Sequence, residues 1–245
     1  MNPLYRSNSQ LQETETVIQS VRLTDDGRTA LVLRDLIFFP NGGGQPNDHG
    51  TVMLRGESFT VTALEKVPGD VLVVLDRKAD FHDELAKKEP VLCALDWDRR
   101  LKIMRMHTAQ HALAAVLRRQ LTGFVTHGMD IPESAETCVM QFSADQPPDS
   151  VAATLAHQAE VARNPAVLVQ SFPSLDDAKA AAGSLFRMNP GIELKGTIRL
   201  ITIEGLDANP CGGTHVLSLG EIGKLSPFIF KELGEGRYSC TFFAL

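Results

Sequence analysis

The sequence feature that most constrains the fold is a pair of histidines four residues apart in a helix-forming segment. The motif is His-Thr-Ala-Gln-His at residues 107–111, and strong helix formers surround it from about Asp98 to Gln120. Residues four apart on a helix lie on the same face, one turn above the other. His107 and His111 therefore point the same way and can bind one metal ion together.

A second motif, Cys-Gly-Gly-Thr-His at residues 211–215, can supply two more ligands to the same ion. Its two glycines allow a tight turn with unusual backbone angles, so Cys211 and His215 can converge on one point. A predicted strand at residues 197–204 leads into this turn. One thiolate and three imidazoles form a ligand set that suits zinc. The sequence therefore predicts one Zn²⁺ site between a helix and a turn at the end of a strand.

The spacing of these ligands argues against two familiar kinds of zinc site. A zinc protease would carry a glutamate directly after the first histidine as its general base, and this chain has Thr108 there. A structural zinc site usually shows compact, cysteine-rich spacing, whereas the two pairs in this chain are far apart. The separation favours a site built between distant elements, at a cleft.

The composition is that of a water-soluble globular protein. The chain has 245 residues, of which 43% are hydrophobic and 22% are charged. No apolar run reaches the ~18–20 residues needed to cross a bilayer. The start of the chain is polar and lacks a signal-peptide core, so a cytoplasmic location without a membrane partner is expected. Three of the four cysteines, Cys93, Cys138 and Cys240, lie in apolar surroundings and are expected to be buried.

The first 95 residues show short strand-like segments with almost no helical periodicity. Turn residues separate these segments, which predicts a small β-barrel domain over residues 1–95. Within it, three consecutive glycines, Gly42, Gly43 and Gly44, open a loop whose backbone can approach a ligand closely. The predicted strands are Val17–Leu23, Thr29–Leu33, Thr51–Leu54, Phe59–Leu64, Asp70–Leu75 and Val91–Leu95.

Residues 96–245 alternate between helical and strand-like segments. This predicts a mixed α/β domain, and hence an α+β fold for the whole chain. Asp96 is placed to cap the long helix, and Gly123 is placed to end it. A second helix is expected at Ser150–Arg163, where His157 has no partner pattern and is expected at the surface. Further strands are predicted at Glu136–Phe142, Val167–Phe172, Thr197–Glu204, Phe228–Lys231 and Tyr238–Phe243.

The charge of the chain bears on its partners. The net charge of −6 argues mildly against nucleic acid, because most autonomous nucleic-acid-binding proteins are basic. A local basic patch can still bind phosphates. Basic residues on or beside the metal-binding helix are candidates for this role, and a solvated helix face explains them equally well. The candidate RNA contacts are Arg99, Arg100, Lys102 and Arg105.

Taken together, the motifs resemble the editing domain of alanyl-tRNA synthetase and, more closely, its free-standing AlaX relatives of medium length. The resemblance rests on His107–His111 followed by Ala-Leu-Ala-Ala-Val-Leu, on Cys211–His215, and on the glycine-rich stretch Gly42–Gly50. It covers roughly residues 38–238. It implies that the chain hydrolyses misacylated tRNA(Ala) in trans, without ATP, with serine as the main misplaced amino acid and glycine as a second candidate.

The resemblance also implies roles for residues outside the metal site. In the related proteins the glycine-rich stretch helps to discriminate the amino acid held in the editing site. The polar stretch Phe124–Pro132 lines the pocket in family editing domains, which makes Thr126 and His127 candidate catalytic residues. Gln110 is a third candidate, as a wall of the pocket. The candidate specificity residues are Gly42, Gly43, Gly44, Gln45 and Asp48.

The sequence leaves three functions open. The first is a zinc-dependent aminoacyl-tRNA deacylase, which the resemblance favours. The second is a non-catalytic, zinc-stabilised module that binds tRNA. The third is a zinc hydrolase of a small ester without an RNA partner. The sequence also leaves open whether zinc activates a water molecule or positions the substrate.

Overall fold

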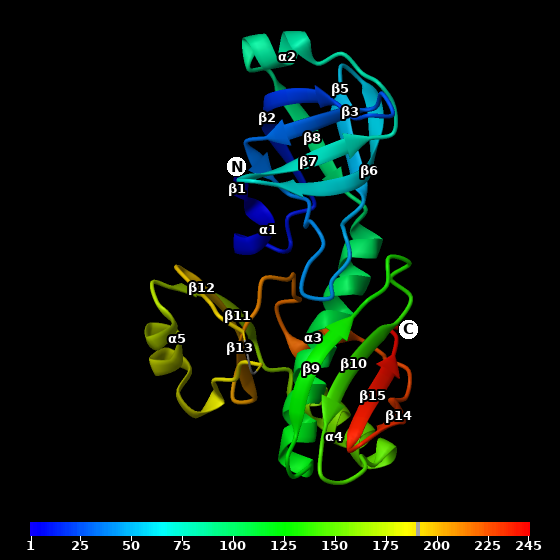
Figure 1. Ribbon diagram of the computed structural model, residues 1–245, viewed down its shortest axis with the longest axis vertical. Coiled ribbons are helices and arrows are strands. Elements are labelled where there is room, and N and C mark those ends of the chain that lie inside the picture. Colours follow the sequence, from blue (N-terminus) through cyan, green and yellow to red (C-terminus); the bar gives the residue numbers. More distant parts are fainter. Residues whose placement is uncertain (190–191) are drawn as a thin grey trace. The chain divides into compact units, whose positions relative to one another are not determined.

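The computed structural model describes residues 1–189 and 192–245, and these residues divide into two compact units. The first unit contains Met1–Gly42 and Pro46–Leu101, and the second contains Gly43–Gln45 and Lys102–Leu245. The predicted α+β fold with an N-terminal barrel is confirmed (Figure 1). The division differs from the expected boundary after residue 95, because it falls inside the long helix and assigns three residues of the glycine-rich loop to the second unit.

The first unit is built around a closed barrel of six strands. Alternate residues of each strand face its core, as the two-residue period of a strand requires. On β6, Phe59 and Val61 are buried, and a bulge after Val61 shifts the next inward position to Leu64. In barrel order the strands are β2 (Glu13–Leu23), β3 (Thr29–Leu33), β7 (Asp70–Leu75), β6 (Glu57–Val67), β5 (Gly50–Leu54) and β8 (Pro90–Leu95). These are the six predicted strands.

Short elements complete the first unit. A two-residue parallel pair joins β1 to β4, and the ring of Tyr5 packs edge-on against Phe39. These elements are β1 (Asn2–Pro3), α1 (Leu4–Ser7), β4 (Asp35–Leu36) and α2 (His82–Lys87).

The second unit is organised around α3 (Trp97–Gln120), whose first residues belong to the first unit. Asp96 caps this helix as predicted, since its Oδ1 accepts a hydrogen bond from the backbone N–H of Arg99 at 3.1 Å. From Ile103 to Leu117 nearly every residue is buried. A helix that is buried on all sides needs neighbours all round, so the remaining elements of the unit must enclose α3.

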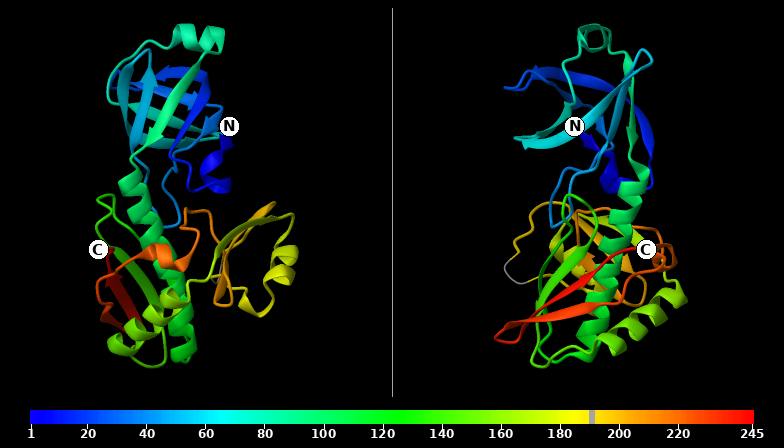
Figure 2. Two further views of the ribbon diagram at one scale, coloured as in Figure 1. Left: turned by 180° about the vertical axis from the view of Figure 1, so that it is seen from behind. Right: turned by 90° about the vertical axis from the view of Figure 1, so that its right-hand side faces the viewer.

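A four-stranded antiparallel sheet and a second helix supply part of that cover. Figure 2 shows α3 and α4 (Ser150–Arg163) on the same side of this sheet. Asp149 caps α4 by accepting hydrogen bonds from two backbone N–H groups of the first turn. The strands, in sheet order, are β14 (Ile229–Gly234), β15 (Arg237–Phe242), β10 (Cys138–Ser143) and β9 (Val125–Asp130). Of these, β9 was not predicted as a strand.

A separate three-stranded sheet positions the second ligand motif. Its strands are β11 (Val167–Phe172), β12 (Ile198–Ile203) and β13 (Asp207–Pro210), with α5 (Leu175–Ala182) packed on β11 and β12. The short strand β13 was not predicted. It pairs with β12 and ends directly before Cys211, so the ladder fixes the position of the turn that follows. Two 3₁₀ turns, η1 (Gly183–Leu185) and η2 (Leu219–Ile222), complete the unit.

The expectation that His157 lies at the surface is wrong. Only 3% of His157 is exposed, because its ring packs edge-on against Phe228 and hydrogen-bonds the backbone of Ala109 on α3. None of the helices formed by the described residues has the length and hydropathy needed to cross a membrane.

Candidate metal centre

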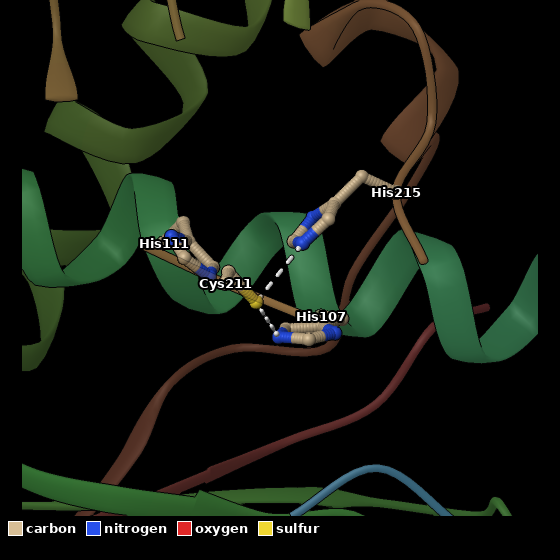
Figure 3. A group of neighbouring side chains, drawn as sticks. All are labelled: His107, His111, Cys211 and His215. Atoms are coloured by element: carbon tan, nitrogen blue, oxygen red, sulfur yellow. Dashed lines mark hydrogen bonds between the residues drawn. The ribbon is translucent and has the colours of Figure 1, made fainter. Parts of the chain in front are cut away.

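The two predicted ligand pairs meet. His107 and His111 lie one turn apart on α3, and Cys211 and His215 reach them from the turn after β13 (Figure 3). One ligand atom from each of the four residues lies within 4.8 Å of all the others. The prediction that distant segments form one cluster able to hold a metal ion is therefore confirmed.

The thiol of Cys211 is the centre of this cluster. Its Sγ lies 3.5 Å from Nε2 of His107 and 3.5 Å from Nε2 of His215. Burial opposes charge on this thiol, but His107 and the other two histidines outweigh burial and lower the pKa of Cys211 well below its usual range. A thiolate is the form of cysteine that binds metals, so the cluster prepares Cys211 for this role.

The other ring nitrogen of each histidine faces a partner within the protein. Nδ1 of His107 lies 3.0 Å from Oε1 of Gln45, and Nδ1 of His215 lies 3.1 Å from Oγ1 of Thr108. Nδ1 of His111 lies 3.9 Å from the carboxylate of Asp207. Such contacts orient metal-binding imidazoles and select the nitrogen that faces the ion.

The electrostatic surroundings differ among the three imidazoles. Burial lowers the pKa of His107, and burial together with the neighbouring His107 lowers the pKa of His215 to about 3. At His111, burial acts in the same direction, but Asp207 and Cys211 outweigh it and raise the pKa to about 9. Burial thus disfavours positive charge on His107 and His215, while Asp207 and Cys211 favour it on His111.

The close approach of the turn to α3 depends on glycine at position 213. A Cβ atom added to Gly213 would lie 2.3 Å from the ring of His107 and 2.6 Å from Oε1 of Gln45. Contacts this short are not tolerated, so any side chain there would displace the turn or the ring. The two glycines of the motif were predicted from the sequence to allow a tight turn. At Gly213, glycine is needed because no side chain fits between the turn and α3.

A cavity of about 340 Å³ opens beside the cluster within the second unit. Three of the four candidate ligands, His107, His111 and Cys211, line it. Apolar and polar side chains contribute equally to the remaining wall, together with two glycines. The polar lining residues are Gln110, Arg118, Thr126, His127, Asn189 and Asn209.

The three candidate catalytic residues all line this cavity. Gln110 is 9% exposed, and its Nε2 donates to the sulfur of Met140 at 3.2 Å. The hydroxyl of Thr126 donates a hydrogen bond to the side-chain oxygen of Asn189. Nε2 of His127 lies 3.0 Å from the hydroxyl of Ser143. The structure brings these residues together, and their roles in chemistry remain proposals.

The five candidate specificity residues separate into different places. Gly43 lines the cavity, whereas Gly44 packs its backbone against β9 and Gln45 lies against His107. Gly42 and Asp48 belong to the first unit and are not part of the lining. Asp48 is 2% exposed, and its carboxylate is held by Arg100 and by the backbone N–H of Phe39. The expectation that Asp48 contacts the substrate is corrected, because its hydrogen-bonding capacity is used inside the barrel unit.

The candidate RNA contacts need a similar correction. Arg100 has no exposed surface, and its guanidinium bonds Asp48 and the backbone oxygens of Ser9 and Ile37. It therefore cannot reach a phosphate. The other three candidates are partly exposed but have partners within the chain, and RNA contact by them remains a proposal. Arg99 donates to the backbone of Asn47, Lys102 pairs with Glu136, and Arg105 donates to the backbone of Glu221.

Sequence reasoning missed two groups of lining residues. The first follows η1 and includes Met188, Asn189, Ile192 and Leu194, which show no motif of their own. The second is Arg118 with Asn209, which both bond the carboxylate of Asp207 outside the lining. Nη1 of Arg118, near the end of α3, lies 3.3 Å from the carboxylate of Asp207. An acidic residue and an asparagine shortly before Cys211 were the available signal for the second group.

The chain is similar in sequence to known proteins. Residues 198–227 match the family model of the threonyl and alanyl tRNA synthetase second additional domain. The chain is similar to the alanyl-tRNA editing protein AlaX-M of Saccharolobus solfataricus, with 30% identity over 239 residues, covering 96% of this chain and 94% of that protein. It is 29% identical to AlaX-L of Pyrococcus horikoshii over 250 residues, covering 99% of this chain and 58% of AlaX-L.

Longer proteins contain a similar region. The alanine–tRNA ligase of Methanobrevibacter smithii is 30% identical over 207 residues, covering 82% of this chain and 22% of the ligase. The chain thus spans about a fifth of the length of the ligases that it matches.

Proposed function

This chain belongs to the alanyl-tRNA editing proteins of the AlaX-M type, and from that membership we propose that it hydrolyses misacylated tRNA(Ala). The substrate is chiefly Ser-tRNA(Ala), with Gly-tRNA(Ala) as a second candidate, and the products are free amino acid and uncharged tRNA. The reaction takes place in trans, on tRNA that has left the synthetase. The observation that carries the proposal is the cavity with three metal ligands in its wall.

We propose Zn²⁺ as the ion, and the spacing of the ligands supports this choice. Zn–S distances of about 2.3 Å and Zn–N distances of about 2.0–2.1 Å in a tetrahedron place sulfur and nitrogen about 3.5 Å apart. The two Sγ–Nε2 distances at Cys211 are each 3.5 Å. The donor set fits as well, since a thiolate with imidazoles is typical of zinc and unlike the oxygen sites of Mg²⁺ or Ca²⁺. A bound Zn²⁺ ion would supply a Lewis acid beside the ester.

The residues of the cavity would bind and orient the aminoacyl end of the tRNA. Thr126 and Asn189 already form a hydrogen-bonded pair in the wall, and both side chains are able to bond a serine hydroxyl. A site built to bond a hydroxyl disfavours a ligand that offers a methyl group instead, because the polar groups of the site are then left without hydrogen-bond partners. This physical difference would spare correctly charged Ala-tRNA(Ala).

Gln110 and His127 are proposed to hold the attacking water or the ester in place. Gln110 has little freedom, because it is buried except for its cavity face and its amide contacts Met140. His127 stands on β9 with its ring bonded to Ser143, which restricts its rotation. Groups held in this way reduce the entropy cost of reaching a reactive geometry.

One observation favours a second candidate function. All four ligands come from the protein, and four protein ligands are more typical of a structural zinc than of a catalytic one. The alternative is therefore a non-catalytic tRNA-binding module that zinc stabilises. The open cavity beside the ligands favours the deacylase, because a purely structural site does not require one.

The test follows ester loss from Ser-tRNA(Ala) and Ala-tRNA(Ala) with the purified zinc-loaded protein. The proposal expects rapid loss of the seryl ester, slow loss of the alanyl ester, and no activity in Cys211→Ala. Binding of tRNA without ester loss would instead support the tRNA-binding module. Hydrolysis of small esters with no effect of tRNA would point to the third function, a small-ester hydrolase.

A further inference from the structure

Gln45 comes from the glycine-rich loop but lies deep in the second unit. Only 2% of its surface is exposed, and it does not line the cavity. The preceding residue, Gly44, is bonded to the residue that follows β9: its backbone oxygen accepts a hydrogen bond from the N–H of Ile131 at 2.8 Å. A Cβ atom added to Gly44 would lie 1.9 Å from the backbone oxygen of Met129. Glycine at this position therefore allows the loop to pack against the strand and directs Gln45 inward.

The side-chain amide of Gln45 joins both ligand segments. Its Oε1 accepts a hydrogen bond from the backbone N–H of Thr214 at 2.9 Å, and its Nε2 donates to Oγ1 of Thr214 at 2.9 Å. The same Oε1 lies 3.0 Å from Nδ1 of His107. One amide thus bonds the turn between Cys211 and His215 and also bonds the helix that carries His107.

These contacts determine which nitrogen of His107 carries the proton. The orientation of a glutamine amide has to be assigned from its partners. A backbone N–H can only donate, so the amide atom that faces Thr214 N must be the oxygen. Since that oxygen can only accept, Nδ1 of His107 must donate to it. The ring is therefore the Nδ1–H tautomer, with the lone pair of Nε2 directed to the cluster at Cys211.

We propose that Gln45 is a positioning residue of the metal centre rather than a reader of the amino acid. It holds His107 in the tautomer and orientation that present Nε2 to the ion, and it anchors the turn that carries Cys211 and His215. The proposal rests on the metal centre of the proposed function. Gln45 follows Gly43, which lines the cavity, by only two positions. One short stretch therefore supplies both a residue of the cavity wall and a residue that positions a ligand.

Four variants of the full-length protein separate this role from simple packing. Gln45→Met keeps the volume but removes every hydrogen bond of the amide. Gln45→Asn keeps the amide but is one methylene shorter, so it cannot reach both His107 and Thr214. Gln45→Glu keeps an acceptor for His107 and for the backbone of Thr214. Thr214→Val removes only the hydroxyl contact and leaves the bond to His107 in place.

The measurement is the Zn²⁺ dissociation constant, obtained by competition with a chromophoric chelator. Residues that orient a ligand typically change metal affinity by about 10–100-fold. We expect such a loss in Gln45→Met and Gln45→Asn, little change in Gln45→Glu, and a smaller loss in Thr214→Val. Wild-type affinity in Gln45→Met, or an equal loss in Gln45→Glu, would overturn the proposal. If Gln45→Met does not fold, Gln45→Asn and Gln45→Glu make the same comparison.

A second readout addresses the tautomer directly. In the zinc-loaded wild type, long-range ¹H–¹⁵N NMR should show the proton of His107 on Nδ1 and the metal on Nε2. Coordination through Nδ1 would contradict the inference. Neither measurement requires hydrolysis. If both expectations are met but the wild type leaves Ser-tRNA(Ala) intact, only the proposed function is refuted. If the wild type hydrolyses Ser-tRNA(Ala) but Gln45→Met binds zinc with unaltered affinity, only the role of Gln45 is refuted.

Discussion

The carboxylate of Asp207 lies 3.9 Å from Nδ1 of His111, and Asp207 itself is 2% exposed. Arg118 and Asn209 bond the same carboxylate, so its position is fixed from several sides. Although burial disfavours charge on His111, Asp207 and Cys211 raise its pKa to about 9. Asp207 therefore contributes negative charge to the surroundings of the cluster without being a ligand.

We expect Asp207→Asn to weaken zinc binding by about tenfold, because the amide keeps the shape but removes the charge behind His111. Chelator competition at neutral pH measures the effect. Asp176→Asn, on the exposed face of α5, is the matched control and should leave zinc affinity unchanged. Equal affinities of Asp207→Asn and wild type would show that the charge of Asp207 does not act on the centre.

The cysteines should differ sharply in their effect on metal content. Cys211→Ala is expected to lose most of the bound zinc, as measured by elemental analysis of the folded protein. Cys93→Ala should keep its zinc and lose only stability, since Cys93 is buried in the barrel and burial raises the pKa of its thiol to about 12. Zinc retained at wild-type stoichiometry in Cys211→Ala would remove Cys211 from the ligand set.

Gly43 offers a test of the cavity wall. Gly43 and Gly56 both have positive φ and open space around an added Cβ, but only Gly43 lines the cavity. Replacing either by alanine should cost about 1 kcal/mol of backbone strain. We expect Gly43→Ala alone to change the ratio of seryl to alanyl ester hydrolysis. A similar ratio in both variants, at similar melting temperatures, would mean that Gly43 has only a structural role.

Arg100 and Asp48 form an ion pair in which both side chains are almost fully buried. Removing one member of a buried pair typically costs about 3–5 kcal/mol, because the other charge is left without a partner. Arg100→Met should therefore lower the urea midpoint of the first unit strongly. The double variant Arg100→Met with Asp48→Leu should recover much of the loss. A stable Arg100→Met protein with weakened tRNA binding would restore Arg100 as an RNA contact.

His157 should make stability depend on pH in a defined window. Burial lowers its pKa from 6.5 to about 4, so the unfolded chain takes up a proton in this interval and the folded chain does not. Stability is thus fully present above pH 6.5 and falls as the pH drops towards 4, by about 3 kcal/mol from this residue. His157→Gln should lose this part of the pH dependence in urea titrations. Parallel curves for the two proteins would contradict the burial of a neutral imidazole.

Sequence patterns predicted those features that depend on short-range stereochemistry. The four-residue spacing of His107 and His111 determines a shared helix face, and the six barrel strands follow from two-residue alternation between turn signals. The helix cap at Asp96 is equally local. The four residues of the cluster were also predicted from the sequence. Two histidines at helical spacing, together with a cysteine and a histidine around a glycine turn, have few other common uses.

Only the tertiary structure decided what surrounds these ligands. Gln45 reaches His107 across 62 positions of sequence, and Asp48 and Arg100 meet inside the barrel unit across 52. Residues 188–194, which include lining residues of the cavity, carry no pattern that marks them. Hydrogen bonds and burial of this kind depend on which distant segments pack together, and local periodicity holds no information about that. The sequence by itself thus determined the four residues of the cluster, while packing determined their orientation, their charge environment and the wall of the cavity beside them.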